Sequence, residues 1–291
     1  MRRDSWGWGA RIGILVIHKD PVPEAEMWAM APPGVTLHAA RFESPRRRGQ
    51  DFGDGAALAV AESPDVARGL EFFGQLELDV ICLCFGSASF LGGTGFDAAF
   101  AARATAMAGG TPVTTAATAM LDAMRATGIG HPLLVSPPWF TSTSGAAAER
   151  YFAAAGVELA GTLRFDLGPG WRRMQTFEVY DNGGHWFVQP HEVYRQVRRS
   201  FPPTADGVLI PGSGFRALEA VGMLERDLGV PVVASNQACL WHCLQLAGIH
   251  SVVSGCGQLF DRRLPGLCRR ATAPAARLPQ PDRPVLTDAH C

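Results

Sequence analysis

The chain has 291 residues, 47% of them hydrophobic, which is enough for one large domain or two compact halves with buried cores. Its 26 basic and 27 acidic residues give a net charge of -1, which argues against nucleic acid or a membrane surface as a partner. No apolar run approaches the roughly 18–20 residues of a membrane span. Seven cysteines, an odd number scattered over a long chain, favour free thiols in a reducing, cytoplasmic setting.

Short β-branched segments alternate with Ala-rich helical segments along the chain. The first apolar run is shorter than most signal-peptide cores, which need about 7–15 residues, and therefore indicates a first strand. The predicted strands are 11–17, 35–42, 79–84, 112–115, 131–135, 157–163, 207–210 and 230–234. The predicted helices include 118–127, 145–155, 190–200, 216–228 and 237–247. This alternation predicts parallel sheets, with ligands bound beyond the carboxyl ends of the strands.

Two strand ends have the same pattern. Residues 79–90 read DVICLCFGSASF and residues 206–215 read DGVLIPGSGF, so each has an aspartate, an apolar strand and a Gly/Ser loop. Such loops expose backbone N–H groups that favour an anion, although an ordinary strand-to-helix turn looks the same. The repeat predicts two half-domains, 1–124 with 236–265 and 125–235. The Pro/Ala/Arg-rich segment 266–291 is predicted to be a disordered tail.

Several segments in collinear order resemble one known family. They are 87–100 (SASFLGGTGFDAAF), 112–116, 121–128, 229–238 and 255–261. Over about residues 10–262 the chain resembles the aspartate/glutamate racemase superfamily, in the branch that holds arylmalonate decarboxylase and maleate isomerase. The resemblance implies an α/β fold of two similar half-domains, with parallel sheets flanked by helices and an active site in the cleft between them. It also implies catalysis without a metal or an organic cofactor.

The resemblance also implies how the family's thiols work. The racemases use one cysteine from each half, whereas the decarboxylase keeps the second-half cysteine to protonate an enediolate after carbon dioxide leaves. In this chain Phe85 and Gly212 occupy the two cysteine positions, and the expected tyrosine falls near Trp139. Two-base racemisation needs both acid and base, and isomerisation needs a nucleophilic thiolate, so these substitutions weaken both activities. Decarboxylation loses only its proton donor.

Four residues are candidates for the missing catalytic groups. His18 follows the first strand, and its ordinary pKa near 6.5 suits acid or base catalysis. Cys239 lies near a helix N-terminus, where a thiol pKa is lowered. Cys84 would need a local bulge to reach the pocket, because adjacent strand residues face opposite sides. Ser213 offers a hydroxyl in the second loop. A solvated turn for His18, packing for the cysteines and a local cap for the serine remain alternatives.

The substrate-binding candidates come from both loops and their surroundings. The first loop is expected to hold a carboxylate through the Ser87 and Ser89 hydroxyls and neighbouring amides. The full set is Lys19, Gly86, Ser87, Ala88, Ser89, Gly212, Gly214, Trp139 and Asn236. No metal ligands are predicted, because the cysteines lack zinc-site spacing. The arginine run 46–48 is predicted to be a solvated surface.

The sequence therefore predicts a cofactor-independent lyase that acts on a small substituted malonate, or a related carboxylate, through an enediolate. A maleate-type cis-trans isomerase, using Cys84, Cys239 or His18, is one alternative. A catalytically silent carboxylate-binding protein is the other. A small carboxylic acid is the expected partner, and a homo-oligomer is compatible with the sequence.

Overall fold

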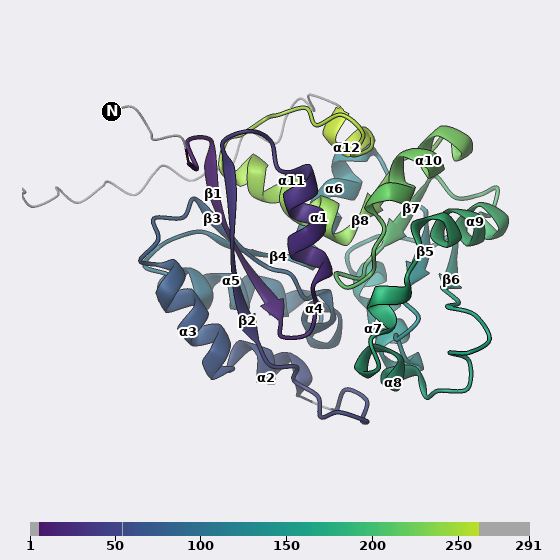
Figure 1. Ribbon diagram of the computed structural model, residues 1–291, viewed down its shortest axis with the longest axis horizontal. Coiled ribbons are helices and arrows are strands. Elements are labelled where there is room, and N and C mark those ends of the chain that lie inside the picture. Colours follow the sequence, from purple (N-terminus) through teal and green to yellow (C-terminus); the bar gives the residue numbers. More distant parts are fainter. Residues whose placement is uncertain (1–5, 54, 262–291) are drawn as a thin grey trace, which may run out of the picture.

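The computed structural model describes residues 6–53 and 55–261. It contains two four-stranded parallel sheets, ordered β2-β1-β3-β4 and β6-β5-β7-β8 (Figure 1). The strands are β1 (Ala10–Ile17), β2 (Val35–Phe42), β3 (Val80–Leu83), β4 (Val113–Thr115), β5 (Pro132–Ser136), β6 (Gly161–Arg164), β7 (Gly207–Ile210) and β8 (Val232–Ala234). Each sheet uses its strands in the same sequential pattern, which confirms the predicted α/β class with two similar halves.

Helices flank both sheets (Figure 1). They are α1 (Val22–Met30), α2 (Ala56–Ala61), α3 (Pro64–Phe73), α4 (Gly86–Gly92), α5 (Thr94–Met107), α6 (Ala116–Thr127), α7 (Ser142–Ala154), α8 (Thr176–Asp181), the 3-10 helix η1 (Gly184–Phe187), α9 (Pro190–Ser200), α10 (Leu218–Leu228), α11 (Ser235–Leu246) and α12 (Gln258–Asp261). Local chemistry sets several of their ends. Thr115 and Thr141 accept backbone hydrogen bonds at the starts of α6 and α7, and Gly128 and Gly229 end α6 and α10 in left-handed conformations.

Helix α11 joins the two halves. It packs against α6, α1 and β3 of the first half and also contacts β8 (Figure 1). Residues 235–244 are all buried, so this helix forms the centre of the core rather than an amphipathic surface. These contacts support placing segment 236–265 with the first half, although the half-domain boundaries stay a prediction. The predicted tail, 266–291, lies outside the described residues.

Several predicted elements differ in their bounds. The predicted strand 157–163 is shorter, because β6 pairs with β5 only over residues 161–164. The helix predicted at 118–127 begins two residues earlier, where Thr115 caps it. The helix predicted at 237–247 also begins two residues earlier, directly after β8. Within the described ranges, no helix has the length and apolar character needed to cross a membrane.

Candidate functional site

A cavity lies between the carboxyl ends of the strands of the two sheets. It is lined by Ile17, Asp20, Ser44, Arg46, Asp51, Phe52, Phe85, Gly86, Ser87, Trp139, Phe140, Phe177, Tyr180, Pro211, Gly212, Ser213 and Gly214. Counted together with its open mouth, the space between these residues is about 620 Å³. The two Gly/Ser loops meet here, since a Cβ placed on Gly86 would lie 3.5 Å from the carbonyl oxygen of Pro211.

The first loop presents only part of its predicted set to the cavity. Gly86 and Ser87 line it, whereas Ala88 and Ser89 are buried behind them. The Ser89 hydroxyl donates a 2.7 Å hydrogen bond to Asp97. Asp97 also accepts bonds from Thr115 and Tyr151, so the structure gives Ser89 a role in tying α4 to α5 and α7 instead of a place at the cavity.

The second loop presents Gly212, Ser213 and Gly214 to the cavity. Asn236 lies beneath it and is buried, donating 2.8 Å hydrogen bonds to the Ser213 carbonyl and to Glu26. It is not among the residues lining the cavity, so it positions the second loop from behind.

Glu26 continues this network across the two halves. Its Oε1 accepts 2.8 Å hydrogen bonds from the backbone N–H groups of Ala217 and Leu218, at the start of α10. Burial raises the pKa of Glu26, and these hydrogen bonds partly oppose the shift. The carboxyl group on α1 thereby fixes the second half against the first.

Aromatic side chains wall the cavity. The Phe52 and Phe85 ring centroids lie 6.1 Å apart, and Trp139 packs edge-on against Tyr180 at 5.4 Å. Trp139 therefore lines the cavity, and its role in binding substrate stays a prediction. The Tyr180 hydroxyl is buried and makes no hydrogen bond to any described residue. Burial, together with the negative charge of Asp20, raises the pKa of Tyr180, so this phenol stays protonated beside the cavity.

Arg46 lines the cavity, and the prediction that the arginine run 46–48 is a solvated surface is wrong for this residue. Its guanidinium donates to both carboxylate oxygens of Asp181, at 2.9 and 3.1 Å, and to the Phe177 carbonyl. The two charged side chains are only 7% and 9% exposed. The Gly49 N–H also donates to Asp181 at 2.9 Å. These bonds fasten the loop after β2 to α8 over the cavity.

Asp20 lines the cavity, although the sequence predicted a functional role only for its neighbours His18 and Lys19. It follows β1, is 3% exposed, and its Oδ1 accepts a 3.1 Å hydrogen bond from the Val22 N–H. Its Oδ2 would lie 2.9 Å from a Cβ placed on Gly214, so the carboxyl group rests directly on the second loop. Burial raises the pKa of Asp20 to about 7, against the opposing charge of Arg41.

His18 and Lys19 lie outside the cavity, although they flank Asp20 in the chain. Both side chains are exposed and line an adjoining surface groove, which shares Ser44, Arg46 and Tyr180 with the cavity. The His18 Nδ1 accepts a 3.2 Å hydrogen bond from the Ser44 N–H. The turn after β1 therefore directs Asp20 inward, while the two predicted residues face solvent.

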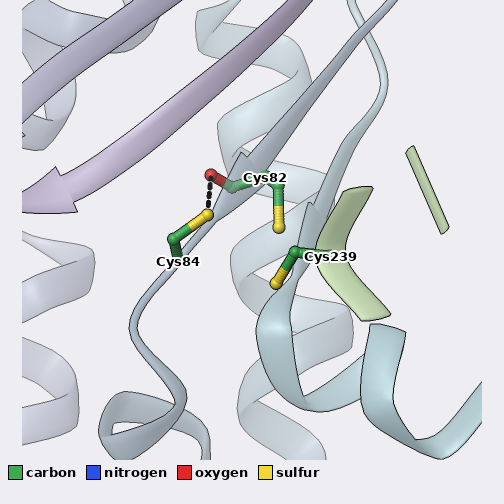
Figure 2. A group of neighbouring side chains, drawn as sticks. All are labelled: Cys82, Cys84 and Cys239. Carbon is green, nitrogen blue, oxygen red and sulfur yellow. Dashed lines mark hydrogen bonds between the residues drawn. The ribbon is translucent and has the colours of Figure 1, made fainter. Parts of the chain in front are cut away.

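Cys84 and Cys239 belong to a buried thiol cluster instead of the cavity. Figure 2 shows them beside Cys82, with all three sulfur atoms within 4.8 Å of one another. Three thiols this close could ligate a soft metal ion, but the cluster is enclosed in the hydrophobic core. Hydrogen bonding to Cys239, together with burial, raises the pKa of Cys84. The structure thus brings neither predicted thiol to the cavity.

Comparisons with known proteins agree with this geometry. The sequence profile of the family described as arylmalonate decarboxylase matches residues 60–260. Arylmalonate decarboxylase of Bordetella bronchiseptica is 32% identical over 208 residues, which cover 70% of this chain and 79% of that protein. This chain belongs to the arylmalonate decarboxylase family.

Solved structures show the same fold. A Gly-to-Cys variant of arylmalonate decarboxylase in its sulfate-associated form has a TM-score of 0.70 and 25% identity, covering 87% of this chain and all of that chain. Maleate isomerase Iso from Pseudomonas putida S16 has a TM-score of 0.73 and 20% identity, covering 87% and 98%. The arylmalonate decarboxylase profile spans both Gly/Ser loops, whereas Asp20 and the loop holding Arg46 lie before its first matched residue.

Proposed function

We propose that the protein is a cofactor-independent decarboxylase that acts on a malonate carrying an aromatic or similarly apolar substituent. The observation that carries this proposal is the cavity itself, where two Gly/Ser loops converge beneath aromatic walls in a member of the arylmalonate decarboxylase family. The backbone and hydroxyls of Gly86, Ser87 and Ser213 are suited to bind carboxylate oxygens. The aromatic walls suit the apolar substituent.

The proposed reaction begins with cleavage of one carboxylate from the substituted carbon. Its electron pair moves into an enediolate on the remaining carboxyl group, and carbon dioxide leaves. Fixed donors around that group stabilise the developing charge, because they need no reorganisation as it forms. We assign this role to the hydroxyls of Ser87 and Ser213, because both residues line the cavity in the two Gly/Ser loops. A proton then adds to the carbon and completes a monocarboxylate product.

The isomerase alternative has less support. Attack on a cis-enedioate requires a thiolate at the cavity, yet all five described cysteines are buried and none lines it. The silent binding protein remains an alternative because Phe85 and Gly212, which line the cavity, are the residues proposed to stand at the family's two thiol positions.

An activity panel separates these functions. Purified protein is incubated with phenylmalonate, methylphenylmalonate, unsubstituted malonate and maleate, while carbon dioxide release and fumarate formation are followed. We expect carbon dioxide from the two arylmalonates and little from malonate. Fumarate from maleate would instead establish the isomerase. Saturable phenylmalonate binding without carbon dioxide would establish the binding protein.

A matched pair of serine variants tests the role of the loop. Ser87→Ala removes a hydroxyl at the cavity, and we expect it to lower kcat about 100-fold, as loss of one oxyanion donor does. Ser251→Ala makes the same change at an exposed position and should leave kcat unaltered. Equal activity of the two variants would contradict a role for the Ser87 hydroxyl.

A further inference from the structure

Decarboxylation through an enediolate needs a proton donor at the cavity. Gly212 has no side chain, and three of the four predicted candidates, Cys84, Cys239 and His18, do not line the cavity. The fourth, Ser213, lines it, but its hydroxyl is a much weaker acid than a carboxyl group. Among the residues that the structure describes, the ionisable groups that line the cavity are Asp20, Arg46, Asp51 and Tyr180. The donor must be sought among these four.

Three of the four are poorly suited to the task. Arg46 is held by Asp181, and an arginine does not release its proton in proteins. Tyr180 has a raised pKa, which makes its phenol a weaker acid than usual. Asp51 is only half-buried and its Oδ1 accepts the N–H of the adjacent Phe52. Asp20 is the remaining group, and it is almost wholly buried.

The geometry points to Asp20 as the proton donor, and we propose that its carboxyl group protonates the carbon from which carbon dioxide has left. This inference rests on the proposed decarboxylation. Asp20 reaches from the end of β1 to the second loop, where the missing side chain of Gly214 leaves room for its Oδ2. The Oδ1 is engaged by Val22, whereas Oδ2 makes no hydrogen bond to any described residue. The acid oxygen is therefore free to face the substrate.

Burial raises the pKa of Asp20 to about 7, against the backbone hydrogen bond from Val22 and the positive charge of Arg41. Arg41 on β2 is the cation that lowers this pKa, but it is paired with Glu24 and donates to the backbone carbonyl of Asp20 instead of its carboxylate. Glu24 and Glu26 on α1 raise the pKa of Asp20 further. Tyr180 faces it from α8 as a neutral phenol, with Arg46 beyond it already paired with Asp181. A pKa of about 7 matches a general acid that works at neutral pH.

The step balances without any further reactant except a solvent proton. The enediolate carbon uses its C=C electron pair to form a new C–H bond, while the O–H bond of Asp20 breaks and leaves a carboxylate. Solvent water then returns a proton to Asp20. In sum, a malonate dianion and one proton become a monocarboxylate anion and carbon dioxide.

The test compares the parent with Asp20→Asn in the full-length protein, using phenylmalonate. We expect phenylacetate formation to fall by about 100-fold or more, the usual contribution of general acid catalysis. Cleavage of the C–C bond does not need the proton. Exchange of ¹³C-labelled carbon dioxide into unreacted phenylmalonate should therefore persist in the variant, which a merely misfolded protein would not show.

The pH profile supplies the second readout. Parent kcat should fall above about pH 7 as Asp20 ionises, whereas Asp20→Asn should lose this decline. Asp51→Asn makes the same chemical change in the same cavity and should retain it. Asp20→Glu keeps an acid one methylene further out and should restore part of the rate, so the inference does not depend on one variant.

Two negative results have different meanings. If the parent is active and Asp20→Asn keeps both its rate and its decline above pH 7, the role of Asp20 is overturned and the proposed function stands. If the parent releases no carbon dioxide from any arylmalonate, the proposed function is overturned, and the role of Asp20 with it.

Discussion

Installing a thiol at position 212 tests both the family comparison and the local packing. A Cβ on Gly212 would lie 2.4 Å from Pro137 Cγ and 3.1 Å from Phe215 Cβ. Ordinary carbon contacts are roughly 3.5–4.0 Å. The backbone is not the obstacle, because Gly212 does not have a positive φ. The obstacle is the rigid ring of Pro137. Gly212→Cys alone should therefore destabilise the protein by about 1–3 kcal/mol, as overpacking does.

A double-mutant cycle isolates this clash. Pro137→Ala removes the Cγ atom and leaves the Cβ, which would lie 3.5 Å from a side chain at Gly212. Pro137→Ala alone should lower the free energy of unfolding by about 0.4–1 kcal/mol, because the unfolded chain gains conformational freedom. The four proteins are compared by urea unfolding. We expect the double variant to be more stable than the sum of the single changes by about 1–2 kcal/mol. Additive effects, or a Gly212→Cys protein as stable as the parent, would refute the packing argument.

The same pair of changes has a catalytic consequence. In the Pro137→Ala background, Gly212→Cys should place a thiol where the arylmalonate decarboxylase scaffold is proposed to carry its proton donor. Added to Asp20→Asn, the pair should restore phenylacetate formation, with a pH dependence that differs from that of the parent. A folded triple variant that binds phenylmalonate without regaining turnover would count against this placement of the donor.

Three further outcomes follow from the site. Asp181→Asn leaves the Arg46 charge buried without its partner. We therefore expect the free energy of unfolding in urea to fall by about 3 kcal/mol and the KM for phenylmalonate to rise. Asp166→Asn, which removes a carboxylate from an exposed ion pair, is the control. Cys239→Ala should keep kcat for carbon dioxide release, since its thiol lies in the core, and loss of turnover in a folded variant would restore its catalytic candidacy. Solvent deuterium should not appear at the α-carbon of either aspartate enantiomer in NMR spectra, and its incorporation with inversion would reveal two-base chemistry.

The fold and the two loops could be predicted because their signals are local. Alternating strands and helices specify parallel sheets, and the carboxyl ends of such strands must meet at one edge. That rule brought Gly86 and Ser87 together with Gly212 and Ser213, which are more than 120 residues away in the chain and line one cavity.

The missed residues depend on contacts that a single segment does not specify. In the sequence, Arg46 belongs to a charged run that predicts a solvated surface. Its burial depends on pairing with Asp181, which is 135 residues away. The local sequence indicates only a turn at Asp20. Its burial depends on contact with the second loop, which is almost 200 residues away in the chain. Conversely, Cys239 does lie near the start of a helix, but that helix has no solvent-facing side along its first ten residues.

Asp20 should also make the stability of the protein depend on pH in a predictable direction. Folding raises its pKa from 3.8 to about 7, so the native state binds more protons than the unfolded state between these values. The neutral carboxyl group therefore contributes its whole stabilisation below about pH 4, and this contribution is lost as the pH rises through 7. At 1.36 kcal/mol per pKa unit the whole effect is about 4 kcal/mol. Asp20→Asn stays neutral at every pH, and Glu26 is present in both proteins, so their difference isolates Asp20. In urea unfolding, the free energy of unfolding of Asp20→Asn relative to that of the parent should rise by a few kcal/mol between pH 5 and pH 8.5. Parallel stability curves would mean that Asp20 is ionised in the folded protein throughout, which would remove the physical basis for its role as an acid.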